Sequence, residues 1–155
     1  MLDSWEVPQA DILADVIKTV RYVQNNPGCS DVNIANHIGK VDRQGRYYRH
    51  AAELLNLINN NSNSATITPD GQHLLNLSVS DQHDFLRNRI ISLRVFHLTE
   101  ELIRTNPGCT ALDIERLLLR EQISDSLAER RSQTILMWLL DLNVIRQIGD
   151  RLYIY

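Results

Sequence analysis

Apolar residues recur at helical spacing in the first third of the chain and predict three consecutive helices. The first is expected at roughly 9–25, where the apolar positions one turn apart are Ile12, Val16, Val20 and Val23. Asn26-Pro27-Gly28 ends it, because proline lacks an amide donor and glycine accepts unusual backbone angles. Ser30 caps a second helix that ends at Gly39, and a third helix follows from about 42 to 58.

The segment after the third predicted helix is polar and then briefly extended. The asparagine and serine run at 59–64 cannot bury itself and indicates a loop. The residues ATIT at 65–68 predict a short strand, Pro69-Asp70-Gly71 a turn, and QHLLNL the start of another short helix. Three helices followed by a strand-bearing loop are the pattern of a winged helix-turn-helix.

A similar order of elements is expected in the second half of the chain. A first helix falls within 81–105, either as one long helix or as a broken one. Helices are also expected over 110–120, with Thr110 as the cap, and over 126–143. Two short apolar segments around Gly149-Asp150 predict a β-hairpin, which is the second wing.

The tetrapeptide Asn-Pro-Gly-Cys occurs twice, at 26–29 and at 106–109, and the flanking segments also match. An amphipathic stretch precedes each copy, and a polar-capped stretch follows it. The similar sequences LLNLI and LDLNVI then close the two third helices. Self-similarity of this length indicates one supersecondary unit used twice. We therefore expect a mainly α fold with small β wings: two tandem winged helix-turn-helix units, at 1–80 and 81–155, that arose by internal duplication.

Composition places the chain among ordinary globular proteins, with 43% hydrophobic and 23% charged residues. No apolar run approaches the roughly 18–20 residues that span a membrane, and MLDSWEVPQAD at the N-terminus has no signal-peptide core. We expect a cytoplasmic protein without a membrane partner. Cys29 and Cys109 lack paired ligands at short spacing and are expected to be buried, and the histidines show no metal-ligand spacing. No metal or other cofactor is therefore expected.

The net charge of −3 weighs against nucleic acid, but the basic residues are unevenly distributed. Between Lys40 and His50 four basic residues accompany a single acidic one. The apolar stripe of this third helix is expected at Ala51, Leu54, Leu55 and Ile58, which places Arg46 and Arg49 on the opposite face. Such an outward row can pair with guanine or hold phosphate in a major groove. The alternative is a solvated basic helix face.

The residues expected to contact DNA in the first repeat are Arg43, Gln44, Arg46, Tyr47, Arg49 and His50. In the second repeat, Gln133 and Leu136 occupy the places of Arg46 and Arg49. Because every residue of 135–140 is apolar, this helix is expected to be buried. The burial expectation is strongest for Trp138, Leu139 and Leu142. Contacts to DNA in the second repeat are then expected from the helix end and the hairpin, at Arg130, Arg131, Gln133, Arg146 and Arg151.

A group of residues around the third helix of the first repeat forms two recognisable motifs. They are Arg43, Gln44, Tyr47, Tyr48, Ala51 and Ala52, followed by Ile67, Thr68, Pro69 and Gly71. These motifs resemble the recognition helix and the Leu-Thr-Pro-x-Gly wing of winged-helix domains attached to restriction endonucleases and related DNA-processing proteins. LAERRSQTILMWLLDL resembles a pattern that follows in the same proteins. The resemblance covers most of the chain and implies a DNA-binding role in restriction-modification.

The Mg²⁺ core of restriction nucleases places an acidic residue two positions before a lysine. Here Val16 precedes Lys18 and Ile38 precedes Lys40, so neither lysine belongs to that motif. We therefore expect the chain not to be an enzyme itself. It is expected to bind double-stranded DNA as a recognition or accessory module of a restriction-type nuclease, with the catalytic domain or subunit outside this chain. The alternatives are a winged-helix transcription regulator and a protein-interaction module that docks through the apolar helix 135–142.

Overall fold

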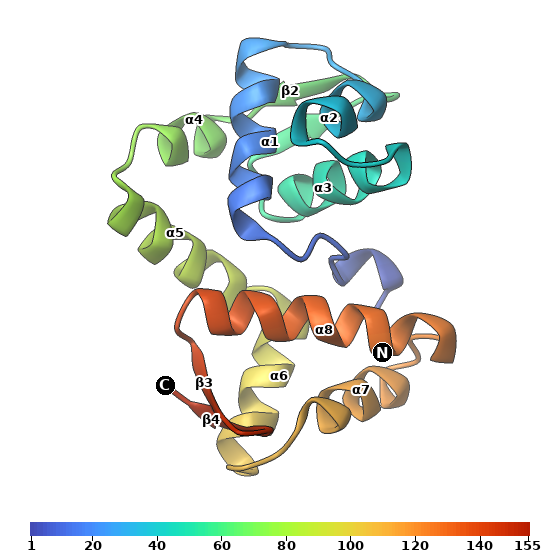
Figure 1. Ribbon diagram of the computed structural model, residues 1–155, viewed down its shortest axis with the longest axis vertical. Helices are drawn as coiled ribbons and strands as arrows, with labels where there is room; N and C mark the ends of the chain where they lie inside the picture. Colours follow the sequence, from blue (N-terminus) through green and yellow to red (C-terminus); the bar gives the residue numbers. More distant parts are fainter. The chain divides into compact units, whose positions relative to one another are not determined.

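The computed structural model describes residues 1–155 and is mainly helical, with two small pairs of antiparallel strands (Figure 1). At this level the predicted fold class, mainly α with small β elements, is confirmed. The chain forms two compact units. The first unit is Ile12–Gln82, and the second unit comprises Met1–Asp11 together with His83–Tyr155. Residues 1–11 therefore fold with the second unit, whereas the sequence-based division at 80 and 81 placed them with the first.

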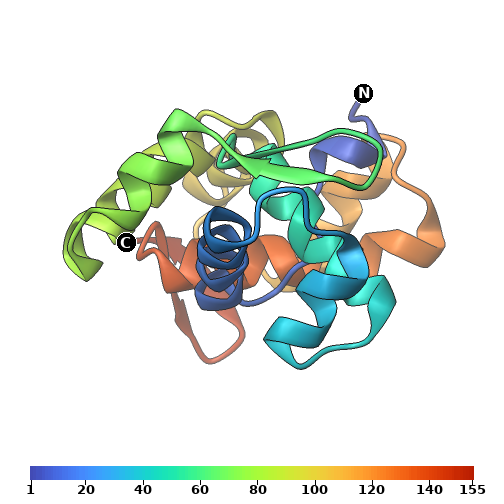
Figure 2. The same cartoon turned by 90° about the horizontal axis from the view of Figure 1, so that it is seen from above.

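The first unit contains three helices, a strand pair and a short fourth helix. Their bounds are α1 Leu13–Asn25, α2 Asp31–Ile38, α3 Asp42–Leu54, β1 Ile58–Asn60, β2 Ala65–Ile67 and α4 Pro69–Leu75. The helices α1, α2 and α3 pack against one another, and β2 packs on α1 (Figure 2). The strands β1 and β2 are antiparallel, with Ile58 opposite Ile67. The core lies where these helices meet the strand pair.

Helix α2 has the predicted bounds, whereas α1 and α3 are shorter than predicted. Capping explains α2, because the Ser30 hydroxyl accepts a hydrogen bond from the Asn33 backbone and Gly39 ends the helix in a left-handed conformation. Helix α3 ends at Leu54 instead of continuing to 58. Asn56 has a φ of 59°, which turns the chain out of the helix and into β1.

Pro69-Asp70-Gly71 forms the first turn of α4, so the predicted free-standing turn at these residues is wrong. Thr68 is the helix cap, because its hydroxyl accepts a hydrogen bond from the Gly71 amide at 3.0 Å. Proline suits the first helical position, where an amide donor has no partner in the helix. A side chain at position 71 would lie 2.1 Å from the Leu57 carbonyl oxygen, so only glycine permits this approach.

Helices α2 and α3 are in tight contact at Gly45. A Cβ atom at this position would lie 2.2 Å from the Asp31 carbonyl oxygen and 2.8 Å from the Ala35 Cβ. We predict that Gly45→Ala lowers the free energy of unfolding by about 1–3 kcal/mol, because overpacking outweighs the better helix propensity of alanine. Urea unfolding measures this change. Asn36→Ala, at an exposed position of α2, is the control and is expected to stay within about 0.5 kcal/mol; an equally small change for Gly45→Ala would contradict the prediction.

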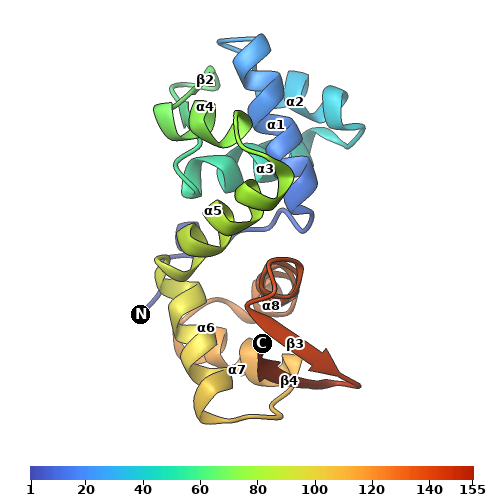
Figure 3. The ribbon, with the colours of Figure 1, turned by 90° about the vertical axis from the view of Figure 1, so that its left-hand side faces the viewer.

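The second unit has the same order of three helices and a strand pair. The bounds are α6 Arg94–Thr105, α7 Ala111–Arg120, α8 Asp125–Asp141, β3 Ile145–Ile148 and β4 Arg151–Ile154. Helix α5, Val79–Ile91, precedes α6, so the segment 81–105 forms two helices separated at Ser92 and Leu93. The predicted hairpin at Gly149 and Asp150 is present, as Figure 3 shows in red. None of the helices combines the length and the apolar character that crossing a bilayer requires.

Each copy of Asn-Pro-Gly-Cys forms a turn, after α1 in the first unit and after α6 in the second, and its backbone bonds to the strand pair of that unit. Gly28 and Gly108 both have a φ of 85°, a conformation that favours glycine. The Gly28 amide donates to the Ala65 carbonyl at 2.7 Å, and the Gly108 amide donates to the Leu152 carbonyl at 2.8 Å. The two strand residues donate in return to the carbonyl of the following cysteine. The repeated tetrapeptide thus adds a backbone bridge to each strand pair.

The two cysteines occupy buried positions in these turns, as expected from the sequence. Cys29 and Cys109 are both free thiols and almost fully buried. Burial raises the pKa of both thiols above the ordinary cysteine value. The cysteines therefore remain protonated at neutral pH and pack as small apolar side chains.

Residues 1–11, the N-terminal arm, are held on the second unit by apolar burial and hydrogen bonds. The buried apolar side chains of the arm are Leu2, Val7 and Ala10. The Leu2 amide donates to the Glu121 carbonyl at 3.0 Å. The indole N–H of Trp138 donates to the Ala10 carbonyl at 2.7 Å. These contacts are the physical reason why the arm belongs to the second unit although it precedes the first in sequence.

The central side chains of α8 are buried as predicted, but the segment is not buried on every side. Trp138, Leu139 and Leu142 have at most 2% exposure, and the Trp138 ring stacks on Phe96 with 5.4 Å between centroids. Leu136, Met137 and Leu140 are half-buried. The expectation of burial therefore holds for one face of α8 and fails for the other.

Candidate functional site

The buried face of α3 differs from the predicted apolar stripe. Its members are Gly45, Tyr48, Ala51 and Ala52, followed by Leu55 at the helix end. The Tyr48 hydroxyl accepts a hydrogen bond from the Ile12 amide at 3.2 Å, which fixes this side of the helix to the start of α1. Leu54 is only half-buried, and Ile58 lies in β1. The outward face is therefore rotated away from the direction that the sequence predicted.

The outward face of α3 carries Arg43, Arg46, Tyr47 and His50. Arg43 and Arg46 are exposed, whereas Tyr47, His50 and the neighbouring Gln44 are half-buried. Arg43 and Arg46 are three residues apart and so project from one side about one turn apart. Neither arginine has a carboxylate within ion-pair distance, so both guanidinium groups are available to a ligand.

Arg49, unlike Arg43 and Arg46, is paired with carboxylates, and its predicted contact with DNA beside Arg46 stays a prediction. Its Nε atom lies 2.8 Å from a carboxylate oxygen of Asp31, and a second nitrogen lies 3.7 Å from Glu53. Only 15% of the Arg49 side chain is exposed. Burial raises the pKa of Glu53, and the Arg49 charge opposes that rise. Arg49 therefore fastens α3 to α2.

The first unit is electrically neutral as a whole, with six basic and six acidic side chains. Lys40 lies 3.6 Å from Asp15, and Arg49 is paired as described above. The cations without an acidic partner are Lys18 and Arg21 on α1, and Arg43 and Arg46 on α3. Positive charge is therefore concentrated on two separate helix faces. The pair on α1 is also exposed and provides an internal control.

The turn between β1 and β2 presents uncharged hydrogen-bonding side chains. The exposed residues there are Asn61, Ser62, Asn63 and Ser64, and Asn59 of β1 is also exposed. The side-chain oxygen of Asn63 accepts a hydrogen bond from the Asp31 amide at 2.9 Å. This bond ties the turn to the N-terminus of α2, next to the crossing with α3. The asparagine-rich sequence indicated a loop here but did not predict its hydrogen bond to α2.

In the second unit, Arg130 and Arg131 contact the N-terminal arm, and their predicted contacts with DNA stay predictions. One Arg130 nitrogen lies 2.7 Å from both carboxylate oxygens of Asp11. Arg131 is only 6% exposed and donates to the Ser4 carbonyl. Gln133 is exposed, as a contact residue must be. The acidic arm and the paired arginines of the second repeat were the sequence signal for this contact, which the prediction missed.

A further arginine of the second unit also binds the arm. Arg94 donates to the carboxylate of Glu6, with one contact at 3.1 Å, and this bond lowers the pKa of Glu6. The exposed side of the first turns of α8 carries Asp125 and Glu129 beside Gln133. Carboxylates at these positions repel phosphate. Helix α8 therefore differs in charge from α3, which presents arginines on the corresponding side.

We predict that Arg130→Ala lowers the free energy of unfolding by about 1 kcal/mol, since the pair with Asp11 is partly exposed to solvent. Nucleic-acid affinity is expected to stay unchanged. Urea unfolding and duplex binding measure the two effects. Arg120→Ala, which removes an exposed arginine from α7 in the same unit, is the control for loss of charge. A loss of affinity confined to the Arg130 variant would restore this residue to the candidate site.

The β3–β4 hairpin carries the two remaining predicted contacts, and both are exposed. Arg146 lies over the ring of Tyr153, on the opposite strand, at 5.8 Å from the ring centroid. Arg151 donates to the Gly108 carbonyl at 3.0 Å and lies 3.7 Å from Asp150. Both arginines remain in contact with solvent, so the hairpin has two cations that can approach a phosphate.

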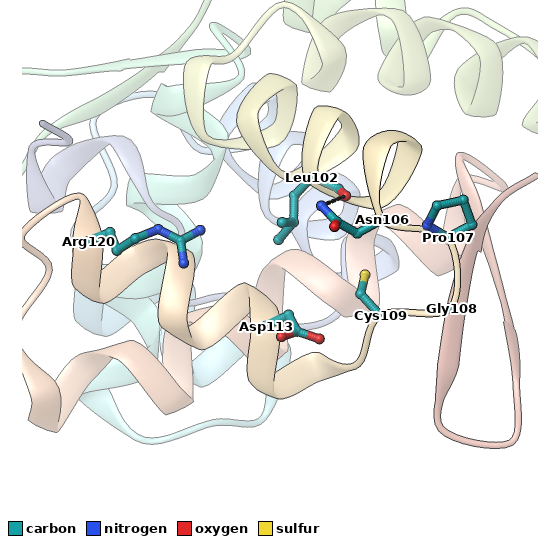
Figure 4. A pocket seen from close by; sticks show the side chains of 7 residues that line it. All are labelled: Leu102, Asn106, Pro107, Gly108, Cys109, Asp113 and Arg120. Carbon is teal, nitrogen blue, oxygen red and sulfur yellow. Dashed lines mark hydrogen bonds between the residues drawn. The ribbon is translucent and has the colours of Figure 1, made fainter.

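A cavity of about 490 Å³ lies beside the second Asn-Pro-Gly-Cys turn (Figure 4). Asn106, Cys109, Asp113 and Arg120 contribute to its walls. The Asp113 carboxylate already accepts a hydrogen bond from the Thr110 amide at 2.8 Å. Burial, with the nearby Asp113 charge, raises the pKa of the Cys109 thiol above the ordinary cysteine value.

The chain belongs to the family described as a domain of unknown function (DUF7226), whose model matches residues 15–143. No curated protein matches the chain. Among solved structures it is similar to the mRNA-binding domain of elongation factor SelB from E. coli in complex with SECIS RNA, with 11% identity over 99% of this chain and 98% of that one. The TM-score is 0.34, a likeness too weak to bear on fold or function.

Proposed function

We propose that the chain binds double-stranded DNA through the outward face of α3. The observation that supports this most is the pair Arg43 and Arg46, which are exposed, free of carboxylate partners and one turn apart. They lie on the second of two helices joined by the short turn Gly39–Val41. In a helix-turn-helix this second helix enters the major groove, where arginine pairs with guanine or with phosphate.

The same proposal includes a tandem winged helix-turn-helix fold that arose by duplication. Support comes from details that recur in both units at corresponding positions. Each third helix has a leucine as its C-cap, Leu55 or Leu142, and an asparagine with positive φ follows it: Asn56 at 59° and Asn143 at 55°. Each first helix contains a buried threonine whose hydroxyl donates to the carbonyl four residues earlier, at Thr19 and Thr99. Recurrence of such specific contacts favours a common origin over chance.

The two units are proposed to contribute unequally. The first unit supplies the groove-binding helix and the uncharged β1–β2 turn. The second unit supplies Arg146 and Arg151 on its hairpin as contacts to the DNA backbone. Its own third helix has its two arginines bound to the arm and does not act as a recognition helix. Free arginines on α3 and bound arginines on α8 support this division of roles.

The chain is further proposed to act without catalysis of its own, as a recognition or accessory module of a restriction-type nuclease. This part rests on the resemblance of the motifs around α3 and on the missing acidic residues before Lys18 and Lys40. A transcription regulator would use the same DNA-binding face without a nuclease partner. The protein-docking alternative through 135–142 would have to use the half-buried Leu136, Met137 and Leu140, because Trp138 and Leu139 have no exposed surface to offer a partner.

Selection of bound sequences from a random duplex library, followed by binding at two salt concentrations, tests the proposal. We expect one enriched sequence motif and an affinity that falls as salt rises, with a slope of roughly two to four units for two to four phosphate contacts. Failure of the wild-type chain to bind any duplex at low salt would overturn the proposed function.

A further inference from the structure

We propose that Asn63 and Asp31 are positioning residues that set the distance between the β1–β2 turn and α3, and thereby the sequence specificity of the DNA site. This inference rests on the proposed function. It assigns a role to two residues that do not belong to the outward face of α3. Their role is to place two ligand-contacting elements relative to each other, with no requirement that either residue touches the ligand.

A continuous set of contacts joins the turn to α3 through the first residue of α2. The Asn63 side-chain oxygen accepts from the Asp31 amide at 2.9 Å. The carboxylate of Asp31 lies 2.8 Å from Nε of Arg49, which is three residues after Arg46 on α3. The Asp31 carbonyl faces Gly45, where a Cβ atom would lie only 2.2 Å from its oxygen. Asp31 therefore contacts the turn on one side and α3 on the other.

The hydrogen bond between the Asn63 side chain and the Asp31 amide, called the anchor below, needs a particular residue type at position 63. The Asp31 amide belongs to the first turn of α2, where backbone donors have no partner within the helix. The side chain at 63 must therefore supply an acceptor. The backbone at this position has a φ of 62°, which asparagine and aspartate tolerate better than other residues with a side chain. Only a short side chain with an oxygen acceptor meets both requirements.

The position of the turn matters because its exposed side chains can only form hydrogen bonds. Asn61, Ser62 and Ser64 carry no charge, so the turn adds nothing to the electrostatic attraction of phosphates. Hydrogen bonds require donors and acceptors placed within a few tenths of an ångström. Loss of the anchor is therefore expected to weaken binding to the correct sequence more than binding to DNA in general.

The test uses two substitutions at one position. Asn63→Gly permits the positive φ but removes the acceptor, whereas Asn63→Asp retains both the acceptor and the conformation. The ratio of affinities for a selected and a scrambled duplex is expected to fall about 2–10-fold in Asn63→Gly, the range of one hydrogen bond. The salt slope should stay unchanged. Asn63→Asp should keep the ratio within about twofold of wild type. Asp31→Asn, which keeps the amide but weakens the pair with Arg49, should lower the ratio in the same direction.

The outcomes separate this inference from the proposed function. If the wild-type chain selects a duplex and Asn63→Gly retains its full ratio, the positioning role is wrong while DNA binding stands. If Asn63→Asp loses the ratio as fully as Asn63→Gly, the hydrogen bond to the Asp31 amide does not set the specificity, and the positioning role is again wrong. If the wild-type chain binds no duplex, both the proposed function and this inference fail. Thermal unfolding of each variant shows whether it is folded, and Asp31→Asn provides an independent variant should Asn63→Gly be unfolded.

Discussion

Replacing Trp138 by alanine is expected to lower the free energy of unfolding by about 3–5 kcal/mol, as a large-to-small change in a core that cannot collapse. The indole has no exposed surface and stacks on Phe96. Its N–H also donates to the Ala10 carbonyl, so the substitution removes a bond that holds the N-terminal arm. Urea or thermal unfolding measures the loss. The arm should detach more readily in this variant than in the wild-type chain.

Trp138→Phe separates the two contributions, because it keeps an aromatic ring on Phe96 but removes the indole donor. We expect this variant to lose about 1–3 kcal/mol, the cost of leaving the buried Ala10 carbonyl without a partner. A loss below about 1 kcal/mol for Trp138→Ala would mean that the tryptophan does not belong to the core. That result would restore the protein-docking alternative for the segment 135–142.

The second large effect is expected from Arg43→Ala combined with Arg46→Ala. Each substitution should weaken binding of the selected duplex by about 1–3 kcal/mol if the guanidinium contacts a base. A phosphate contact would lower affinity for all duplexes alike and reduce the salt slope by about one unit for each arginine. Stability should change by less than about 0.5 kcal/mol, because both side chains are exposed and unpaired. Fluorescence anisotropy with selected and scrambled duplexes measures the effect.

Local signals in the sequence were sufficient for several elements of the fold. Ser30 and Gly39 gave the bounds of α2, because a cap and a left-handed end are determined by the residues themselves. The hairpin at Gly149 and Asp150 was predictable for the same reason. The repeated Asn-Pro-Gly-Cys correctly indicated two buried cysteines, although their role in bridging to the strands required the structure.

The candidate site was only partly predictable. The outward face of α3 depends on which residues form its buried stripe, and that stripe was predicted from a helix that was taken to be longer. A helix continued to 58 places Leu54 and Ile58 on its apolar stripe and turns Arg49 outward. The observed end at Leu54 and the burial of Tyr48 turn Arg49 toward Asp31 instead. Arg46 points outward in both cases, so its predicted outward position did not depend on this error.

The contacts of Arg130 and Arg131 with the N-terminal arm were not predictable, for a different reason. Both positions belong to a helix end that the sequence shows as basic and open to solvent. Their partners, Asp11 and Ser4, are more than a hundred positions away in the chain. No periodicity within the helix contains information about a partner at that separation. Charge complementarity between the acidic arm and the second repeat was the one signal present.

The most direct test of the central claim compares two double variants that remove the same charge from the same unit. One is Arg43→Ala with Arg46→Ala on α3, and the other is Lys18→Ala with Arg21→Ala on α1, all exposed and without carboxylate partners. Affinity for the selected duplex is measured by anisotropy at two salt concentrations. Loss of binding in the α3 variant alone is the predicted result. Equal losses in both variants, or no loss in the α3 variant while the wild-type chain binds well, would contradict the account.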